Sequence, residues 1–347
     1  MKNIKSFHPG LYLKESLQAM EMTAKEFSFR TGISERILSA IINEKCDITF
    51  DVAFKLAKYF DCSINYWTNL QNQYNLYKKE KEEELDLQID WNLIKNIKPY
   101  LVANKYINED DNNQIIVEKI RKIIGVNKLS FLENKDMFVS FKEKDSKKEN
   151  DIFLQNFWIA LALNEARKIK CNKYSKIKLN NSIKEIKNLT MTNQKYFYQK
   201  LKDIFLECGI SFVILPYLSN SNIYGVTKWL NKDNVMVAIS NKSERADIFW
   251  FTLFHEISHV LMEHHREFLI NVDGFEDDKA DKMANELLIN SNKWNEFILN
   301  NDFSVNSINN FALSVGILPS IVTGRLYKEN YISYENYNKR SNVKYKF

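Results

Sequence analysis

Two short helical segments on either side of a single glycine, within residues 23–43, place the strictest limit on how this chain can fold. In the sequence TAKEFSFRTGISERILSAIIN, Thr23 is suited to cap a helix, and Glu26 follows three residues later in a capping-box arrangement. Gly32 suits a tight turn, and Ser34 can cap the second helix. Helix, glycine turn and helix at this spacing predict a helix-turn-helix motif.

The second helix of this motif has an apolar side and a polar side. The residues predicted to be buried are Ile37, Leu38, Ile41 and Ile42. The residues left to face outward, where a major groove would lie, are Glu35, Arg36, Ser39, Ala40 and Asn43.

Charge favours a DNA-binding role for this region only weakly. Residues 1–76 contain nine Lys and Arg against eight Asp and Glu, and affinity for DNA depends largely on contacts with phosphates. The alternative is a domain that docks a protein partner or drives dimerisation. The residues predicted to contact DNA are Lys25, Ser34, Glu35, Arg36, Ser39, Asn43 and Lys45.

Nearly all of residues 8–76 resembles the HigA-type antitoxin branch of the lambda-repressor-like helix-turn-helix domains. The resemblance runs from HPGLYLKESL through TFDVAFKLAKYF to the ending that contains Trp67, Asn69, Leu70 and Gln71. It implies a domain of five helices, a DNA operator, a possible homodimer and a possible RelE/HigB-like toxin as partner.

Composition extends the helical prediction beyond this region. Glycine (8) and proline (4) are scarce in 347 residues, so we expect a mainly α-helical protein with a small β-sheet. The charged run at 77–88 is predicted to be a solvated linker or an exposed helix. Residues 90–200 are compatible with helices. Three β-rich runs follow, ISFVILPYL, NIYGVTKWL and NVMVAISN.

Cysteine usage and hydropathy indicate a cytoplasmic protein. The four cysteines are scattered without a C-x-x-C pair, which argues against a thiolate zinc site and a disulfide framework. The N-terminus lacks the apolar segment of a signal peptide. Apolar runs stay below the ~18 residues that a membrane helix needs, so no membrane partner is expected.

Four of the five histidines lie between residues 255 and 265, in the sequence HEISHVLMEHH. His255 and His259 are four apart, so a helix presents both imidazoles on one face to one metal ion. Glu256 between them can reach water at the metal without being a ligand. The H-E-x-x-H pattern therefore predicts a Zn²⁺ site with His255 and His259 as ligands and Glu256 as general base.

A catalytic zinc usually has a third protein ligand, and two regions offer one. His265 stands at the metzincin distance, but Met262 occupies the position of the required glycine, and a continuing helix would turn His265 away from the metal. Asp277 and Asp281 match the gluzincin arrangement, in which an acidic ligand is followed four residues later by an aspartate that orients a histidine. Asp277 is thus the preferred ligand, with Glu276 as a competitor.

The strands before the histidine helix suggest where a substrate would bind. NIYGVTKW or VMVAIS is a candidate edge strand that holds an extended peptide through its main chain. The alternative is that both are interior strands of a small sheet.

From about residue 150 onward the chain resembles the ImmA/IrrE metallopeptidase family. The matching segments are NIYGVTKWL, VMVAISNKSERADIFWFTLFHEISHVLMEHH, EDDKADKMANELLI and INNFALSVGILPSIVTGRLYKE. The resemblance implies a gluzincin-like α+β fold with His255, Glu256 and His259 in the family roles. Aspartate at position 277 departs from the glutamate common in the family.

Together these features predict four regions. They are a helix-turn-helix domain (1–76), a charged linker and helical scaffold (77–200), a zinc metallopeptidase core (201–295) and a C-terminal helical extension (296–347). The preferred function is a regulatory zinc endopeptidase that hydrolyses a repressor or antitoxin. The alternative is a HigA-like antitoxin or repressor whose zinc domain is a sensor or toxin-binding module without turnover.

Overall fold

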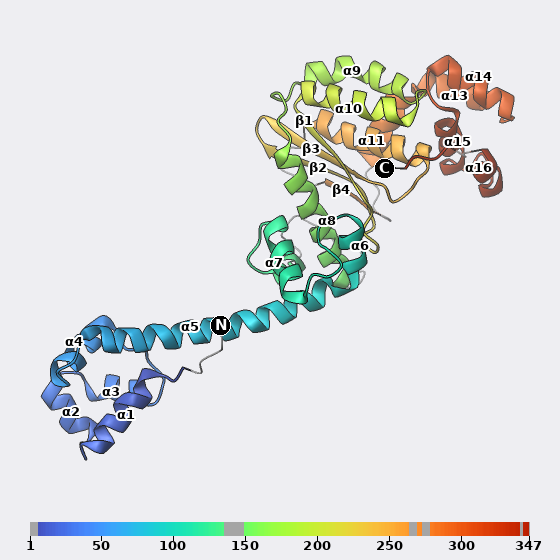
Figure 1. The fold of residues 1–347 in the computed structure, drawn as a ribbon. Helices are drawn as coiled ribbons and strands as arrows, with labels where there is room; N and C mark the ends of the chain where they lie inside the picture. The colour runs from blue at the N-terminus through green and yellow to red at the C-terminus, as the bar shows by residue number, and fades with distance from the viewer. Residues whose placement is uncertain (1–5, 135–148, 264–268, 273–277, 341–342, 347) are drawn as a thin grey trace. The chain divides into compact units, whose positions relative to one another are not determined.

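The computed structural model describes residues 6–134, 149–263, 269–272, 278–340 and 343–346, and divides the chain into two compact units. Unit 1 comprises residues 1–89 and unit 2 residues 90–347. Helices dominate both units (Figure 1), which confirms the prediction of a mainly helical chain with a small sheet.

Unit 1 contains the five helices predicted for the first domain. They are α1 (Pro9–Ala19), α2 (Ala24–Thr31), α3 (Glu35–Ile42), α4 (Phe50–Tyr59) and the first half of α5 (Ile64–Ile94). Their inward residues form one hydrophobic core, in which Leu13, Phe27, Leu38, Ile41 and Leu56 are fully buried. Burial of these apolar side chains is what holds five short helices together.

The charged run at 77–88 lies inside α5, so the prediction of an exposed helix is confirmed. Lys79 pairs with Glu82 at 2.6 Å and Lys81 with Glu84 at 2.7 Å, each one turn apart. Such exposed pairs contribute only a few tenths of a kcal/mol each to helix stability.

Unit 2 begins at the end of α5 and contains the remaining helices and all four strands. Its helices before the sheet are η1 (Lys95–Ile97), α6 (Lys98–Ala103), α7 (Asn113–Ile124), η2 (Leu129–Glu133), α8 (Glu149–Lys168), α9 (Lys176–Leu189) and α10 (Gln194–Cys208). Its later helices are α11 (Ala246–Met262), α12 (Asp278–Leu288), α13 (Ser291–Leu299), α14 (Val305–Val315), α15 (Pro319–Lys328) and α16 (Tyr334–Arg340). In the described part of the chain, no single helix meets the length and hydropathy of a membrane span, although the bent pair α14 and α15 does so by length and composition alone.

The sheet has the order β1-β3-β2-β4. Its strands are β1 (Ile210–Leu215), β2 (Ile223–Asn231), β3 (Asn234–Ser240) and β4 (Leu269–Val272). β1 runs parallel to β3, whereas β2 is antiparallel to both β3 and β4. Of the two alternatives for β2 and β3, the interior position is confirmed and the edge position is wrong, because the unpredicted strand β4 pairs with β2 and β1 pairs with β3.

Helices cover both faces of this sheet (Figure 1). In β3, Val235, Val237 and Ile239 belong to the core that α9, α10 and α11 share. Met236 and Ala238 alternate with them and are equally buried, so they face the opposite side, where α8 packs. Coverage on both faces explains why β3 is an apolar run rather than an alternating one.

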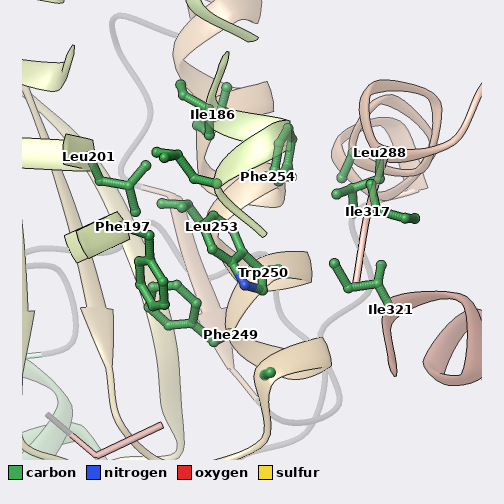
Figure 2. Packing of buried hydrophobic residues seen from close by; sticks show 14 of the residues in the cluster. Ile186, Phe197, Leu201, Phe249, Trp250, Leu253, Phe254, Leu288, Ile317 and Ile321 are labelled. Carbon is green, nitrogen blue, oxygen red and sulfur yellow. The ribbon is translucent and has the colours of Figure 1, made fainter. Parts of the chain in front are cut away.

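Aromatic residues fill the space between α10 and α11 (Figure 2). The ring of Phe197 lies 5.0 Å from Trp250 and 5.7 Å from Phe249, measured between centroids. This single core contains residues from Leu179 to Tyr345. It therefore extends across the predicted boundaries at 200/201 and 295/296.

Hydrogen bonds with residues near the C-terminus hold the first turns of α11 in place. The Ala246 amide donates to the Val343 carbonyl at 2.9 Å, and the Trp250 indole donates to the Tyr345 hydroxyl at 2.9 Å. The Tyr337 hydroxyl donates to Asp247 in the first turn of α11 at 2.7 Å. The helix that carries the H-E-x-x-H sequence is thus held by residues about 100 positions later in the chain.

Candidate metal centre and DNA-binding surface

The H-E-x-x-H residues lie in the middle of α11, a helix buried along almost its whole length. Its apolar residues Trp250, Leu253, Phe254 and Ile257 are fully buried. Hydrophobic contact on both sides fixes the rotation of the helix about its axis. As a result His255, Glu256 and His259 are held inside unit 2, each less than 5% exposed.

The two imidazoles face one another through their Nε2 atoms. The distance between His255 Nε2 and His259 Nε2 is 3.1 Å. Two nitrogen ligands that lie 2.0–2.1 Å from a tetrahedral zinc ion are roughly 3.3 Å apart. The histidine pair therefore fits two adjacent ligand positions of one zinc ion.

Asp281 of α12 determines which nitrogen of His255 faces the pair. Its Oδ1 lies 2.8 Å from His255 Nδ1, so a carboxylate there accepts the Nδ1 proton and leaves Nε2 with a lone pair. This is the tautomer that binds a metal through Nε2, with an aspartate behind the ring as in zinc sites generally. Asp281 thus lies where its predicted orienting role requires.

Lys328 of α15 also contacts Asp281, with its Nζ 2.9 Å from Oδ2. Burial by itself raises the pKa of Asp281, but the hydrogen bonds from His255 and Lys328 outweigh burial and hold this pKa below its usual value. Asp281 is accordingly ionised at neutral pH. The contact with Lys328 was not predicted, because 47 residues separate the two positions in the sequence.

Glu256 is fully buried, and strand β2 holds its carboxylate. The hydroxyl of Thr227 donates to Glu256 Oε2 at 2.6 Å. A Cβ atom built on Gly225 would lie 2.5 Å from Glu256 Oε1, so only glycine leaves room for the carboxylate there. Neither residue was predicted. An isolated glycine within a predicted strand is the signal that could have indicated a close approach.

All candidates for a third metal ligand lie outside the described residues. Asp277, Glu276, His264 and His265 all fall there, so the assignment of Asp277 stays a prediction. Among the residues that the structure describes, no group of three potential ligands is assembled. The helix α11 ends at Met262 with Glu263 in the left-handed conformation, so the premise that the helix continues to His265 is wrong.

The helix-turn-helix motif forms as its capping residues predict. The Thr23 hydroxyl accepts from the Glu26 amide at 3.2 Å, and the Ser34 hydroxyl accepts from the Ile37 amide at 3.3 Å. Gly32 ends α2 with a φ of 66°, a conformation that favours glycine. The Glu26 carboxylate pairs with Arg30 at 2.6 Å.

The surface of α3 differs from the prediction most clearly at Ile37, while Ala40 and Ile42 are both partly buried. Leu38 and Ile41 are fully buried, but Ile37 is 40% exposed, so its predicted burial is wrong. Ile37 precedes Leu38 by about 100° around the helix, which places it at the border of the outward face. All seven residues predicted to contact DNA are exposed, namely Lys25, Ser34, Glu35, Arg36, Ser39, Asn43 and Lys45.

Comparison with known proteins agrees with this geometry. The helix-turn-helix family model HTH_3 matches residues 13–67. An uncharacterised HTH-type transcriptional regulator of Escherichia coli K12, YbaQ, is 31% identical over 98 residues, which cover 28% of this chain and 85% of YbaQ. The chain belongs to the helix-turn-helix family.

Two further proteins are similar to part of this chain. Virulence-associated protein I of Dichelobacter nodosus is 30% identical over 80 residues, which cover 23% of this chain and 74% of that protein. A solved structure of the Pseudomonas aeruginosa antitoxin HigA with the higBA promoter is 29% identical and covers 25% of this chain and 92% of that chain, with a TM-score of 0.23.

Proposed function

We propose that this chain is a DNA-binding regulator whose helix-turn-helix domain reads an operator through α3. The observation that carries the proposal is the capped α3, which turns Glu35, Arg36 and Ser39 to solvent while Leu38 and Ile41 anchor it in the core. A recognition helix enters the major groove with such an outward face. The relative YbaQ is described as a transcriptional regulator of the HTH type.

The charge of residues 1–76 is nearly balanced, which affects how this domain gains affinity for DNA. Nine basic residues oppose eight acidic ones in residues 1–76, so few phosphates are neutralised by each copy. Specific affinity then depends on base contacts and on a second copy bound at a symmetric half-site.

Replacing Arg36 by alanine is expected to weaken binding to the selected operator by roughly 5- to 150-fold, the range for loss of a bidentate contact with guanine. Fluorescence anisotropy on an operator selected from random duplexes measures this change. Arg30→Ala is the matched control, since it removes an equal charge from α2, where Arg30 pairs with Glu26. It should weaken selected and scrambled DNA equally. Equal binding of both sequences by the wild-type protein would contradict sequence-specific recognition.

We also propose that unit 2 is a zinc-dependent peptidase that cleaves a protein partner, such as a repressor or an antitoxin-like regulator. The fit of the His255 and His259 nitrogens to zinc, with Asp281 behind His255, supports this role. Zinc bound at such a site acts as a Lewis acid and lowers the pKa of water. Asp277 is the proposed third ligand.

The chain's own residues supply the rest of this chemistry. Glu256 accepts the proton of the attacking water, and Thr227 fixes the orientation of its carboxylate. The buried aromatic residues of α11 exclude bulk water from the site. An extended substrate can add to β4, which pairs with Gly225, Val226 and Thr227 of β2, the segment that lies against Glu256.

A second candidate function is a HigA-like antitoxin or repressor whose zinc domain binds a toxin without turnover. Full burial of Glu256 favours it, because a general base must reach water and substrate. The two candidates share the metal site and the DNA-binding domain. They differ in catalysis, because removal of the Glu256 carboxylate changes a rate of peptide hydrolysis only if unit 2 is a peptidase.

A further inference from the structure

The outward face of α3 has an apolar side that the core of unit 1 does not use. Ile37 is 40% exposed and is not part of the hydrophobic cluster that contains Leu38 and Ile41. Ala40, three residues later, is only partly buried. Residues three apart are neighbours on a helix surface, so Ile37 and Ala40 form one continuous apolar strip beside Arg36.

Packing does not account for an isoleucine at position 37. Ile33 in the turn and Leu38 in the helix belong to the core of unit 1, with 2% and 0% exposure, whereas Ile37 does not. A β-branched side chain is also a poorer helix former than leucine or lysine at an exposed position. The role of Ile37 therefore lies on the outside of the helix.

We propose that Ile37 and Ala40 contact the methyl group of a thymine in the major groove, next to the base that Arg36 reads. Thymine is the only standard base with a C5-methyl group, and apolar side chains recognise that group by contact. Arg36 pairs best with guanine, so the operator half-site should contain a thymine beside a guanine. This inference rests on the proposed DNA binding and adds the base class that α3 selects.

The other outward side chains of α3 are polar, so the strip of Ile37 and Ala40 is the part of this face that can contact a methyl group. The Asn43 amide donates to the Ser39 carbonyl at 2.8 Å and approaches the Ser39 hydroxyl at 3.4 Å. Glu35 and Ser39 lie on the opposite border of the face and offer polar groups. Because nine basic residues oppose eight acidic ones in residues 1–76, a methyl contact adds specificity there without a further cation.

The test removes the proposed methyl contact in two ways, by a change in the DNA and by a change at Ile37. An operator is selected with the full-length wild-type protein, and each thymine in a half-site is replaced in turn by uracil, which lacks only the C5-methyl group. Binding is measured by fluorescence anisotropy for wild type, Ile37→Ala and Ile37→Val. At one thymine, uracil should weaken wild-type binding roughly four-fold, the effect of one buried methyl-sized group. Ile37→Ala should bind both operators alike, and Ile37→Val should keep most of the discrimination.

Each result decides the inference. Equal wild-type binding to every thymine and uracil operator would overturn it while the proposed DNA binding stands. An equal loss with uracil in wild type and Ile37→Ala would also overturn it, because the methyl group would then act through DNA shape. Failure of the wild-type protein to bind any DNA would overturn the proposed function as well. Circular dichroism should show unchanged folding, since Ile37 lies outside the core.

Discussion

Glu256→Gln is expected to lower the rate of peptide hydrolysis by roughly 10²- to 10⁴-fold, the usual contribution of a general base. Glutamine has almost the same shape as glutamate, and its amide oxygen can still accept from the Thr227 hydroxyl. It cannot accept a proton from water at neutral pH. The zinc content should stay at the wild-type level, because Glu256 is not a ligand.

Initial rates of cleavage of an unfolded protein such as casein, with the zinc-loaded full-length chain, measure this effect. Thr227→Val is the companion variant, since it removes the hydroxyl that orients Glu256 and leaves the carboxylate in place. It should reduce the rate less than Glu256→Gln does. A Glu256→Gln protein that cleaves at the wild-type rate would refute the assigned base. A zinc-loaded wild type without cleavage would favour the antitoxin or repressor.

Asp90→Ala is expected to lower the free energy of unfolding of unit 2 by about 3–5 kcal/mol, as removal of one partner from a buried ion pair does. Asp90 is 1% exposed, and its carboxylate accepts from Arg121 Nε at 2.7 Å and from the Leu129 amide at 2.8 Å. It also accepts from the Ser130 amide at 3.1 Å. Alanine removes these three bonds and the carboxylate of Asp90 that lies beside the buried Arg121 guanidinium.

Calorimetric unfolding of the full chain tests this prediction, because the two units can unfold in separate transitions. The exposed Asp110, which lies in the same helical region, provides the matched control. Asp110→Ala should change stability by less than about 0.5 kcal/mol. An Asp90→Ala change as small as that of the control would show that the carboxylate stabilises nothing.

Local sequence patterns predicted the elements that short-range forces determine. The caps at Thr23 and Ser34 and the left-handed Gly32 need only neighbouring residues, so both helices of the motif formed as expected. The apolar residues of α11 likewise repeat with helical spacing and are buried. The predicted burial of Ile37 was wrong, because this residue lies at the border of the apolar side of α3. Periodicity alone does not determine whether such a border residue contacts the core.

Contacts between segments that lie far apart in the chain could not be predicted from local sequence patterns. Thr227 reaches Glu256 because β2 packs against α11, and 29 residues separate the two positions in the sequence. Lys328 reaches Asp281 through the packing of α15 on α11. The role of Asp90 was not predicted, because Arg121 and Leu129 lie 31 and 39 residues later in the sequence.

Metal content per chain is the most direct test of whether unit 2 holds a zinc ion. Elemental analysis of the full-length protein, reconstituted with zinc and dialysed, would be compared for wild type, His259→Ala, Asp277→Ala and His265→Ala. We expect a zinc stoichiometry close to one for wild type and His265→Ala, and near zero for His259→Ala and Asp277→Ala. Zinc lost with His265→Ala but retained with Asp277→Ala would reassign the third ligand. A wild-type chain that holds no zinc after reconstitution would contradict the metal centre itself.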